Sequence, residues 1–168
     1  MYELTNGKAS LFEEFFNFHD TTNRVEIQKL KRKIQKFLRT AEGDRTQLMD
    51  VILILDSYID EFEYNNFSSA YHIVAPVVER LVSEKNWDFY DTHIAALVVG
   101  YGKDYKVTND FAQRILSALE EYKSKERYNA LKLATCFNVL SRFLRAKYFE
   151  LENIGTSADF EDLTNMFT

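Results

Sequence analysis

The feature that most constrains this fold is a ten-residue pattern that nearly repeats. Segment 78–87 is echoed by segment 119–128, an offset of 41 residues (128 − 87), and the matching positions are Glu79 with Glu120, Ser83 with Ser124 and Trp87 with Tyr128. Each copy looks like the end of an amphipathic helix, then a charged turn, then an aromatic residue that opens the next helix. A period of this length suggests stacked helical hairpins.

The composition agrees with this interpretation. One proline and five glycines in 168 residues are few for a strand-rich fold, and 46% hydrophobic content is enough for a sizeable core. We therefore expect an all-α fold of stacked antiparallel helical hairpins, like tetratricopeptide or HEAT arrays, with about seven helices. We expect a single domain over 1–155 and an acidic amphipathic tail over 156–168, whose apolar residues are Phe160, Leu163 and Phe167.

The spacing of apolar residues locates the expected helices. Residues 1–10 are expected to be a frayed lead-in. Asn23 and Asp44 are in position to cap helices. Pro76 either kinks its helix or separates two shorter ones. The spacing predicts a short helix near 11–18 and longer helices over 24–40, 45–63, 67–84, 87–101, 109–123 and 127–151.

Charge and cysteine content bear on the compartment. A net charge of −5 argues against a nucleic-acid binder that uses its whole surface. Cys136 is the single cysteine and lies in an apolar stretch, so we expect a buried structural thiol in a reducing, cytoplasmic compartment. Residues 1–10 lack the apolar core of a signal peptide, and no apolar run approaches the roughly 20 residues of a membrane span.

No residue pattern supports an enzyme. The three histidines do not lie at metal-ligand spacing, and Glu-x-x-His pairs, phosphate-binding glycine loops and Gly-x-Ser-x-Gly turns are absent from the sequence. Satisfied or exposed histidines and solvated carboxylates are the simpler explanation. We expect no catalytic residue, no metal and no cofactor. The histidines are His19, His72 and His93.

One helix of this acidic chain is strongly basic. Two interpretations stay open: a solvated face whose charges find acidic neighbours elsewhere, or a contact for phosphate or an acidic partner. The residues of this basic face are Lys29, Arg32, Lys33 and Lys36.

Helical arrays expose a concave face that binds peptides. Tyrosine, asparagine and arginine suit such a face because they combine contact area with hydrogen bonding. A plain core or surface role is the alternative for each candidate. The candidate ligand-binding residues are Tyr71, His72, Tyr101, Asn138 and Arg142.

A family resemblance rests on segments 81–91 and 129–140, which read LVSEKNWDFYD and NALKLATCFNVL. In these segments, the chain resembles the C-terminal regulatory domain of Rgg/MutR-type transcription regulators of Gram-positive bacteria. The resemblance implies a tetratricopeptide-like superhelix that binds a signalling peptide and dimerises. The chain departs from the family because it shows no convincing N-terminal helix-turn-helix. It is then either a regulatory region by itself or a stand-alone relative.

These observations predict a cytoplasmic, non-enzymatic domain that binds a peptide or protein, acts as the sensing part of a regulator and forms a homodimer. The alternative is a small helical nucleic-acid-associated protein that uses the basic face. A third possibility is a dimer that exchanges its tail and first helix between subunits.

Overall fold

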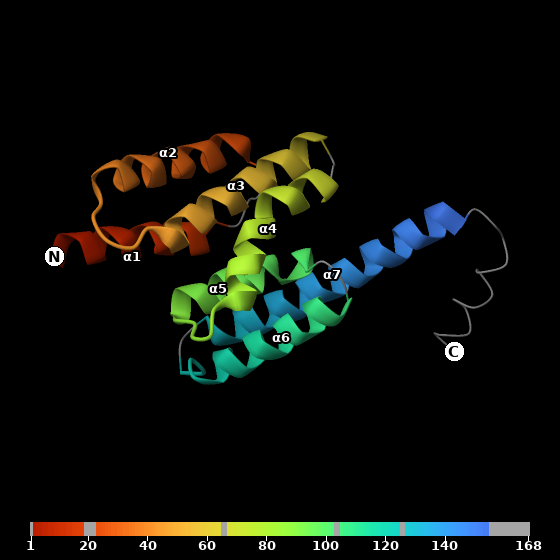
Figure 1. Ribbon diagram of the computed structural model, residues 1–168. Coiled ribbons are helices and arrows are strands. Elements are labelled where there is room, and N and C mark those ends of the chain that lie inside the picture. Colours follow the sequence, from red (N-terminus) through yellow and green to blue (C-terminus); the bar gives the residue numbers. More distant parts are fainter. Residues whose placement is uncertain (1, 19–22, 65–66, 103–104, 125–126, 155–168) are drawn as a thin grey trace.

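The structure is a computed structural model, and it describes residues 2–18, 23–64, 67–102, 105–124 and 127–154. Within those ranges the chain forms helices and no strand, which confirms the expected all-α array (Figure 1). The elements are α1 (Tyr2–Phe16), α2 (Arg24–Thr40), α3 (Thr46–Tyr64), α4 (Phe67–Ser83), α5 (Phe89–Val98), the 3-10 turn η1 (Val99–Tyr101), α6 (Tyr105–Glu120) and α7 (Tyr128–Ile154).

The near-repeat in the sequence corresponds to two consecutive hairpins, α4–α5 and α6–α7. In both, the aromatic residue at the hairpin turn bonds back to the helix before it. The Trp87 indole donates to the Leu81 carbonyl over 3.0 Å, and the Tyr128 hydroxyl donates to the Glu120 carboxylate. The two segments at the 41-residue offset therefore lie at corresponding turns between consecutive helices.

The predicted cap at Asn23 is confirmed, whereas Asp44 lies one residue before the cap position of α3 and still bonds to its first residue. Helix α2 spans the predicted residues, and Asn23 Oδ1 accepts the Glu26 backbone N–H over 3.3 Å. Asp44 Oδ1 accepts the Thr46 N–H over 2.9 Å at the start of α3. In both places a short polar side chain satisfies a backbone donor that a helix leaves unpaired at its first turn.

The prediction of a frayed lead-in at residues 1–10 is wrong, because α1 begins at Tyr2. Gly7 lies inside this helix, and its lack of a side chain serves packing. A Cβ atom at Gly7 would lie 2.7 Å from Cε2 of Phe37 on α2. The glycine thus lets α1 and α2 approach closely, which offsets its poor helix propensity.

Two helix starts also differ from the prediction. Trp87 precedes α5, which is capped by Asp88, and the predicted end of that helix is the separate 3-10 turn η1. Helix α6 begins at Tyr105, four residues before the predicted start at 109. Pro76 lies inside the continuous helix α4, which changes direction partway along its length in Figure 1.

The core is built around α3 and α5. The apolar face of α3 is buried at Leu48, Val51, Ile54 and Leu55, whereas Phe62 near the end of the same helix is 60% exposed. Helix α5 is buried on nearly all sides. Helix α1 packs on it through two aromatic stacks, Phe12 on Tyr90 at 4.3 Å and Phe16 on His93 at 3.4 Å between ring centroids.

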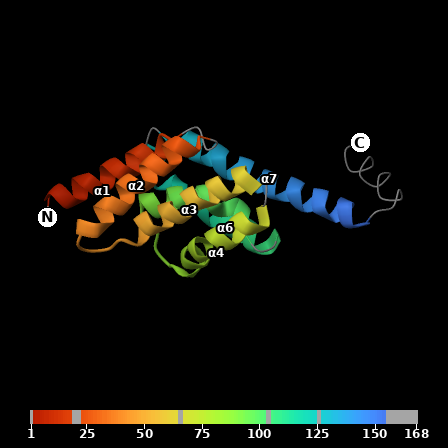
Figure 2. The same ribbon diagram turned by 90° about the horizontal axis from the view of Figure 1, so that it is seen from above.

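Helix α7 is the longest element, and its C-terminal part extends beyond the other helices in both views (Figures 1 and 2). No helix in the described part of the chain combines the length and apolar character needed to cross a bilayer. The predicted tail, 156–168, lies outside the described residues.

Candidate functional site

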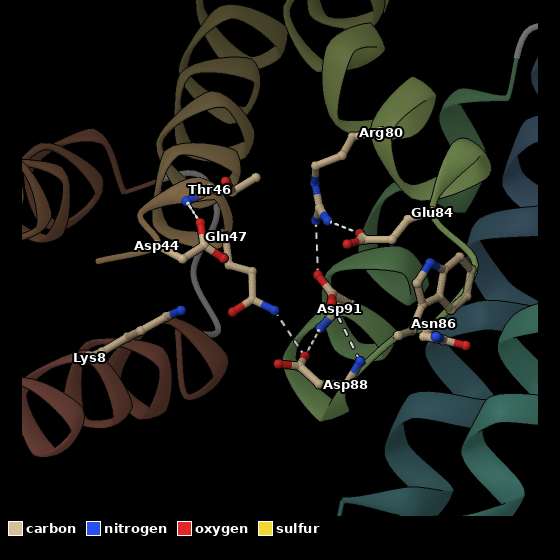
Figure 3. A pocket seen from close by; sticks show the side chains of 10 residues that line it. Lys8, Asp44, Thr46, Gln47, Arg80, Glu84, Asn86, Asp88 and Asp91 are labelled. Atoms are coloured by element: carbon tan, nitrogen blue, oxygen red, sulfur yellow. Dashed lines mark hydrogen bonds and ion pairs between the residues drawn. The ribbon is translucent and has the colours of Figure 1, made fainter. Parts of the chain in front are cut away.

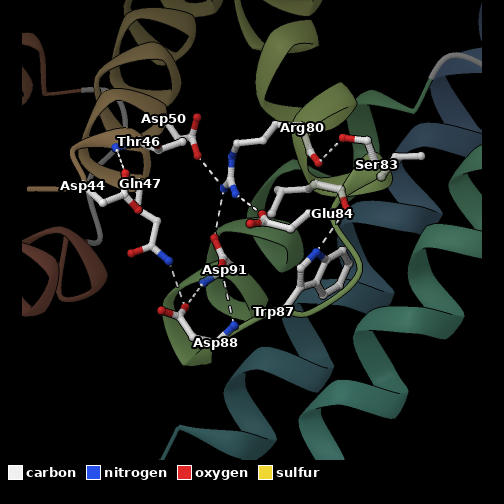
Figure 4. Close-up of polar contacts among 12 residues, drawn as sticks. Asp44, Thr46, Gln47, Asp50, Arg80, Ser83, Glu84, Trp87, Asp88 and Asp91 are labelled. Carbon is white, nitrogen blue, oxygen red and sulfur yellow. Dashed lines mark hydrogen bonds and ion pairs between the residues drawn. The ribbon is translucent and has the colours of Figure 1, made fainter.

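A partly buried arginine, Arg80, joins three helices. Arg80 on α4 places Nη2 2.5 Å from Asp50 Oδ2 on α3 and 3.0 Å from Asp91 Oδ1 on α5. Its Nη1 pairs with Glu84, which lies four residues on and just past the end of α4 (Figure 4). We call Arg80, Asp50, Asp91 and Glu84 the Arg80 cluster.

The start of α5 holds the Arg80 cluster in place. Asp88 Oδ1 accepts the Asp91 backbone N–H over 2.9 Å, and the Asp91 carboxylate accepts the Asp88 N–H, which makes a reciprocal capping box. Gln47 on α3 donates to Asp88 over 2.9 Å. Asp91 therefore has a fixed orientation before it meets Arg80.

The cluster contains one cation for three carboxylates. The Asp50 and Asp91 side chains are 8% and 7% exposed, so water solvates them little. Burial raises the pKa of Asp50 to about 6, against the attraction of Arg80, which lowers it. The cluster therefore has excess negative charge next to solvent.

A polar cavity of about 470 Å³ opens beside this cluster (Figure 3). Its wall comes from five parts of the chain: α1, the α2–α3 loop, α3, α4 and the α4–α5 turn with the start of α5. Acidic groups outnumber basic ones. The charged lining residues are Lys8, Asp44, Arg80, Glu84, Asp88 and Asp91.

The Arg114 side chain, stacked on the Trp87 ring, holds the end of α4 in place. The Arg114 guanidinium carbon lies 3.8 Å from the centroid of a Trp87 ring. Its Nη1 donates to the carbonyls of Leu81 and Val82 over 3.0 and 3.3 Å, and Nη2 donates to the Glu84 carbonyl. Arg114 from α6 thus satisfies the carbonyls that α4 leaves unpaired at its last turn.

A second cavity, of about 300 Å³, lies between α4 and the η1–α6 segment. Its wall is mainly apolar, from Ala75, Val78, Val82 and Val107, with Glu79 and Ser83 as polar groups. Tyr71 and Tyr101 complete the wall, so we call this space the tyrosine cavity. Val82 is 48% exposed, which places part of the wall at the molecular surface.

The five candidate ligand-binding residues separate into two groups. Tyr71 and Tyr101 meet at the tyrosine cavity. Tyr101 is 9% exposed and donates to Glu61 Oε2 over 3.1 Å, so its prediction as an exposed groove residue is wrong. Burial, more than the nearby Glu61 carboxylate, raises the pKa of Tyr101, so its hydroxyl stays protonated and remains a hydrogen-bond donor. His72 is exposed, and its ring meets the Tyr71 ring edge-on at 5.6 Å.

Asn138 and Arg142 form the other group, on α7. Asn138 Nδ2 donates to the Ala96 and Leu97 carbonyls over 2.9 and 3.4 Å, and Arg142 Nε donates to the Gly102 carbonyl over 3.4 Å. Both side chains hold α7 against the end of α5 and the η1 turn. They do not line the tyrosine cavity.

On the basic face of α2, the first of the two interpretations fits the observed ion pairs. Lys33 pairs with Glu14 on α1 at 2.5 Å, and Lys29 pairs with Glu26 at 3.4 Å. Lys31, on the same helix, pairs with Asp56 on α3 at 2.5 Å. These carboxylates lower the net positive charge available to a phosphate. Arg32 and Lys36 are exposed.

Two further side chains singled out in the sequence, His93 and Cys136, lie in different surroundings: the first is buried and the second is exposed. His93 is 5% exposed, and burial, with a smaller contribution from Arg127, lowers its pKa to about 3, so it is a neutral stacking partner of Phe16. Cys136 was expected to be buried, but it is exposed because it lies between the bundle-facing and solvent-facing sides of α7. Among the described residues no group of histidine, cysteine and acidic side chains is arranged to hold a metal ion.

Sequence reasoning missed two features, the Arg80 cluster and a solvent-facing apolar row on α7. The cluster has no sequence signal, because its members come from three helices. The row does have one: Leu133, Phe137, Leu140 and Leu144 are spaced by four, three and four residues.

Comparisons of the chain with family models, curated proteins and solved structures give no match, so they neither support nor exclude the resemblance to Rgg/MutR-type regulators.

Proposed function

We propose that this chain is a non-enzymatic interaction domain that binds a short peptide, or an exposed segment of a partner protein, at the tyrosine cavity. The observation that supports this most is an apolar cavity of about 300 Å³ in which two of the candidate residues, Tyr71 and Tyr101, share one wall. Binding sites are typically concave and mainly apolar, with a few polar groups that fix orientation.

The cavity dimensions suggest the type of ligand. A space of this volume accepts one large apolar side chain, and the surrounding valines would gain contact area when water leaves. Glu79, an exposed carboxylate on the wall, would attract a cationic or amide donor beside that side chain. We therefore expect a segment in which a large apolar residue is followed or preceded by a basic one.

The charge of the molecule supports the same choice. The net charge is −5, and the polar cavity beside the Arg80 cluster has more acidic than basic groups. A basic segment would be attracted to this surface, whereas an acidic segment would be repelled. If the resemblance to Rgg/MutR-type regulators holds, the domain would be the sensing part of a transcription regulator.

The test is selection from a displayed library of random peptides against the immobilised full chain. Val82→Glu places a charge in the wall of the cavity at a half-exposed position, so it should block an apolar side chain without burying an unpaired charge in the core. The matched control is Val25→Glu, because Val25 is 73% exposed on α2.

We expect the wild-type chain and Val25→Glu to enrich the same peptides, with a large apolar residue next to a basic one, and Val82→Glu to enrich none of them. Peptides that bind all three chains equally would contradict the proposal. So would a selection that enriches no sequence.

A further inference from the structure

Helix α7 has two opposite faces with the same spacing. Leu131, Thr135, Asn138 and Arg142 face the bundle: the first two are 3% and 1% exposed, and the last two bond to carbonyls of neighbouring elements. The positions two residues further along, 133, 137, 140 and 144, lie almost on the other side, because two residues turn a helix by about 200°.

This opposite face is the more apolar one. Leu133 is 72% exposed, Phe137 66%, Leu140 55% and Leu144 61%. We call these four residues the outer row. The other large apolar side chains that are exposed in the described part of the chain are spread over three helices. A helix usually buries its apolar face, and here that face points to solvent.

The spacing of the outer row indicates the shape of its occupant. Intervals of four, three and four residues are the a and d positions of a heptad, which form the seam between two helices packed along each other. The occupant should be a helix with the same spacing. Another α7 is such a helix.

The neighbouring residues allow the pairing of identical faces. Ala134, Cys136, Ser141 and Phe143 flank the outer row, and none of them carries a charge. Two copies would therefore meet without like charges at the seam, even though the chain as a whole has a charge of −5.

The area is sufficient for a reversible dimer. More than half of each of the four side chains is exposed, so the outer row offers on the order of 400 Å², within the range of functional surface patches. Two rows would bury about 800 Å², and flanking residues would bring the total towards the roughly 1,200 Å² at which stable interfaces begin. We therefore expect a dissociation constant in the micromolar range.

The tail of the same chain is a poorer occupant. A helix over 160–167, which would place Phe160, Leu163 and Phe167 on one side, is only about 10 Å long. From Leu133 to Leu144 the outer row rises about 16 Å along the axis of α7, so this short helix would cover only part of it. An extended tail would reach it, but successive residues then alternate sides, so Phe160 would point away from Leu163 and Phe167.

We propose that the outer row of α7 is the interface of a homodimer, in which it packs along the outer row of a second copy. None of its four residues lines the tyrosine cavity, so the interface and the proposed ligand site are separate surfaces. The dimer would place two ligand sites in one particle.

The first test is sedimentation velocity of the full chain from 1 to 200 μM, a range set by the expected micromolar affinity. The average mass should rise from 19.8 kDa towards twice that value. Phe137→Glu should remain monomeric at every concentration. Its matched control, Phe62→Glu on α3, makes the same change at a position that is 60% exposed, and it should dimerise as the wild type does. Far-ultraviolet circular dichroism of both variants should be unchanged.

The second test uses Cys136, the single cysteine, which is exposed beside Phe137 on α7. Its reaction with a maleimide dye should slow at least threefold from 1 to 200 μM in the wild type and should not slow in Phe137→Glu.

Two results would overturn the proposal. One is a wild-type chain that stays monomeric throughout the range. The other is loss of the dimer on Phe160→Ser with Phe167→Ser, which would assign the interface to the tail.

Discussion

The Arg80 guanidinium lies 2.5 Å from the Asp50 carboxylate, and this ion pair joins α4 to α3 at a position where Asp50 is 6% exposed. Burial of Asp50 still raises its pKa to about 6. The free-energy cost of burying the charged carboxylate therefore exceeds the stabilisation that the ion pair with Arg80 provides. Protonation of Asp50 consequently favours the folded state.

The first prediction concerns the pH dependence of stability at Asp50. The pKa of this carboxyl is about 6 in the folded state, against its ordinary value of 3.8 in the unfolded chain. The folded state therefore binds more protons between these values, and stability rises as pH falls through 6 towards 3.8. From pH 7 to 4.5 the gain is about 2 kcal/mol. Other groups titrate in the same range, so urea unfolding should be compared between variants: on going from pH 7 to 4.5, Asp50→Asn should fall behind the wild type and the control Asp110→Asn by about 2 kcal/mol. The same change in stability in all three chains would refute the assignment.

The second prediction concerns His93, whose effect has the opposite sign. Its pKa is about 3 in the folded state, against its ordinary value of 6.5 in the unfolded chain, so the unfolded state binds the proton first. Stability is then lost as pH falls from 6.5 towards 3, by about 2 to 3 kcal/mol at pH 4.5. His93→Phe should remove this loss, because phenylalanine can also stack on Phe16. The exposed-site control His72→Phe should retain it. An acid-unfolding curve of His93→Phe identical to the wild type would contradict the buried, neutral histidine.

The third prediction concerns the end of α4. Arg114→Met removes donors to three carbonyls and the cation over Trp87, and should lower the free energy of unfolding by about 1 to 2 kcal/mol. Trp87 is the only tryptophan, so its fluorescence reports the site directly. We expect its emission to shift to longer wavelength as water gains access. Arg39→Met, an exposed arginine on α2, is the control. Unchanged emission and stability in Arg114→Met would show that the stack is not formed.

The fourth prediction concerns the attachment of α1. Arg127 donates to the Phe16 carbonyl over 3.0 Å and to Asn17 Oδ1 over 2.5 Å, and it lies 3.4 Å from the Glu13 carboxylate. Arg127→Met should speed amide hydrogen exchange in α1 at least several-fold and leave α3 unchanged. It should also raise the pKa of His93, because the positive charge of Arg127 contributes to its lowering. Exchange in α1 at the wild-type rate would show that the aromatic stacks alone hold this helix.

Much of the fold could be predicted from the sequence because it depends on local patterns. The apolar spacing and Asn23 predicted the bounds of α2, and the 41-residue offset predicted the two C-terminal hairpins. Helix α1 was missed because Gly7 and its polar neighbours resemble a loop until the packing of Phe37 is known. That packing is a tertiary contact and leaves no local signal.

Less of the candidate site could be predicted, for the same physical reason. Tyr71 and Tyr101 were chosen as exposed side chains, yet they meet at a cavity only because α4 and η1 pack together, and that packing buries Tyr101. Asn138 and Arg142 have the side chains of a ligand site but bond to the protein's own carbonyls. A single sequence does not show which hydrogen-bonding groups the fold itself will use.

Binding of an apolar peptide side chain in the tyrosine cavity is tested most directly by isothermal titration calorimetry. The ligand would be the most enriched selected peptide, titrated into the full chain and into two variants. We predict equal affinity for the wild type and Val25→Glu, and at least a tenfold loss in Val82→Glu, which corresponds to about 1.4 kcal/mol. Equal affinity for Val82→Glu and the wild type would place the peptide elsewhere and contradict the claim.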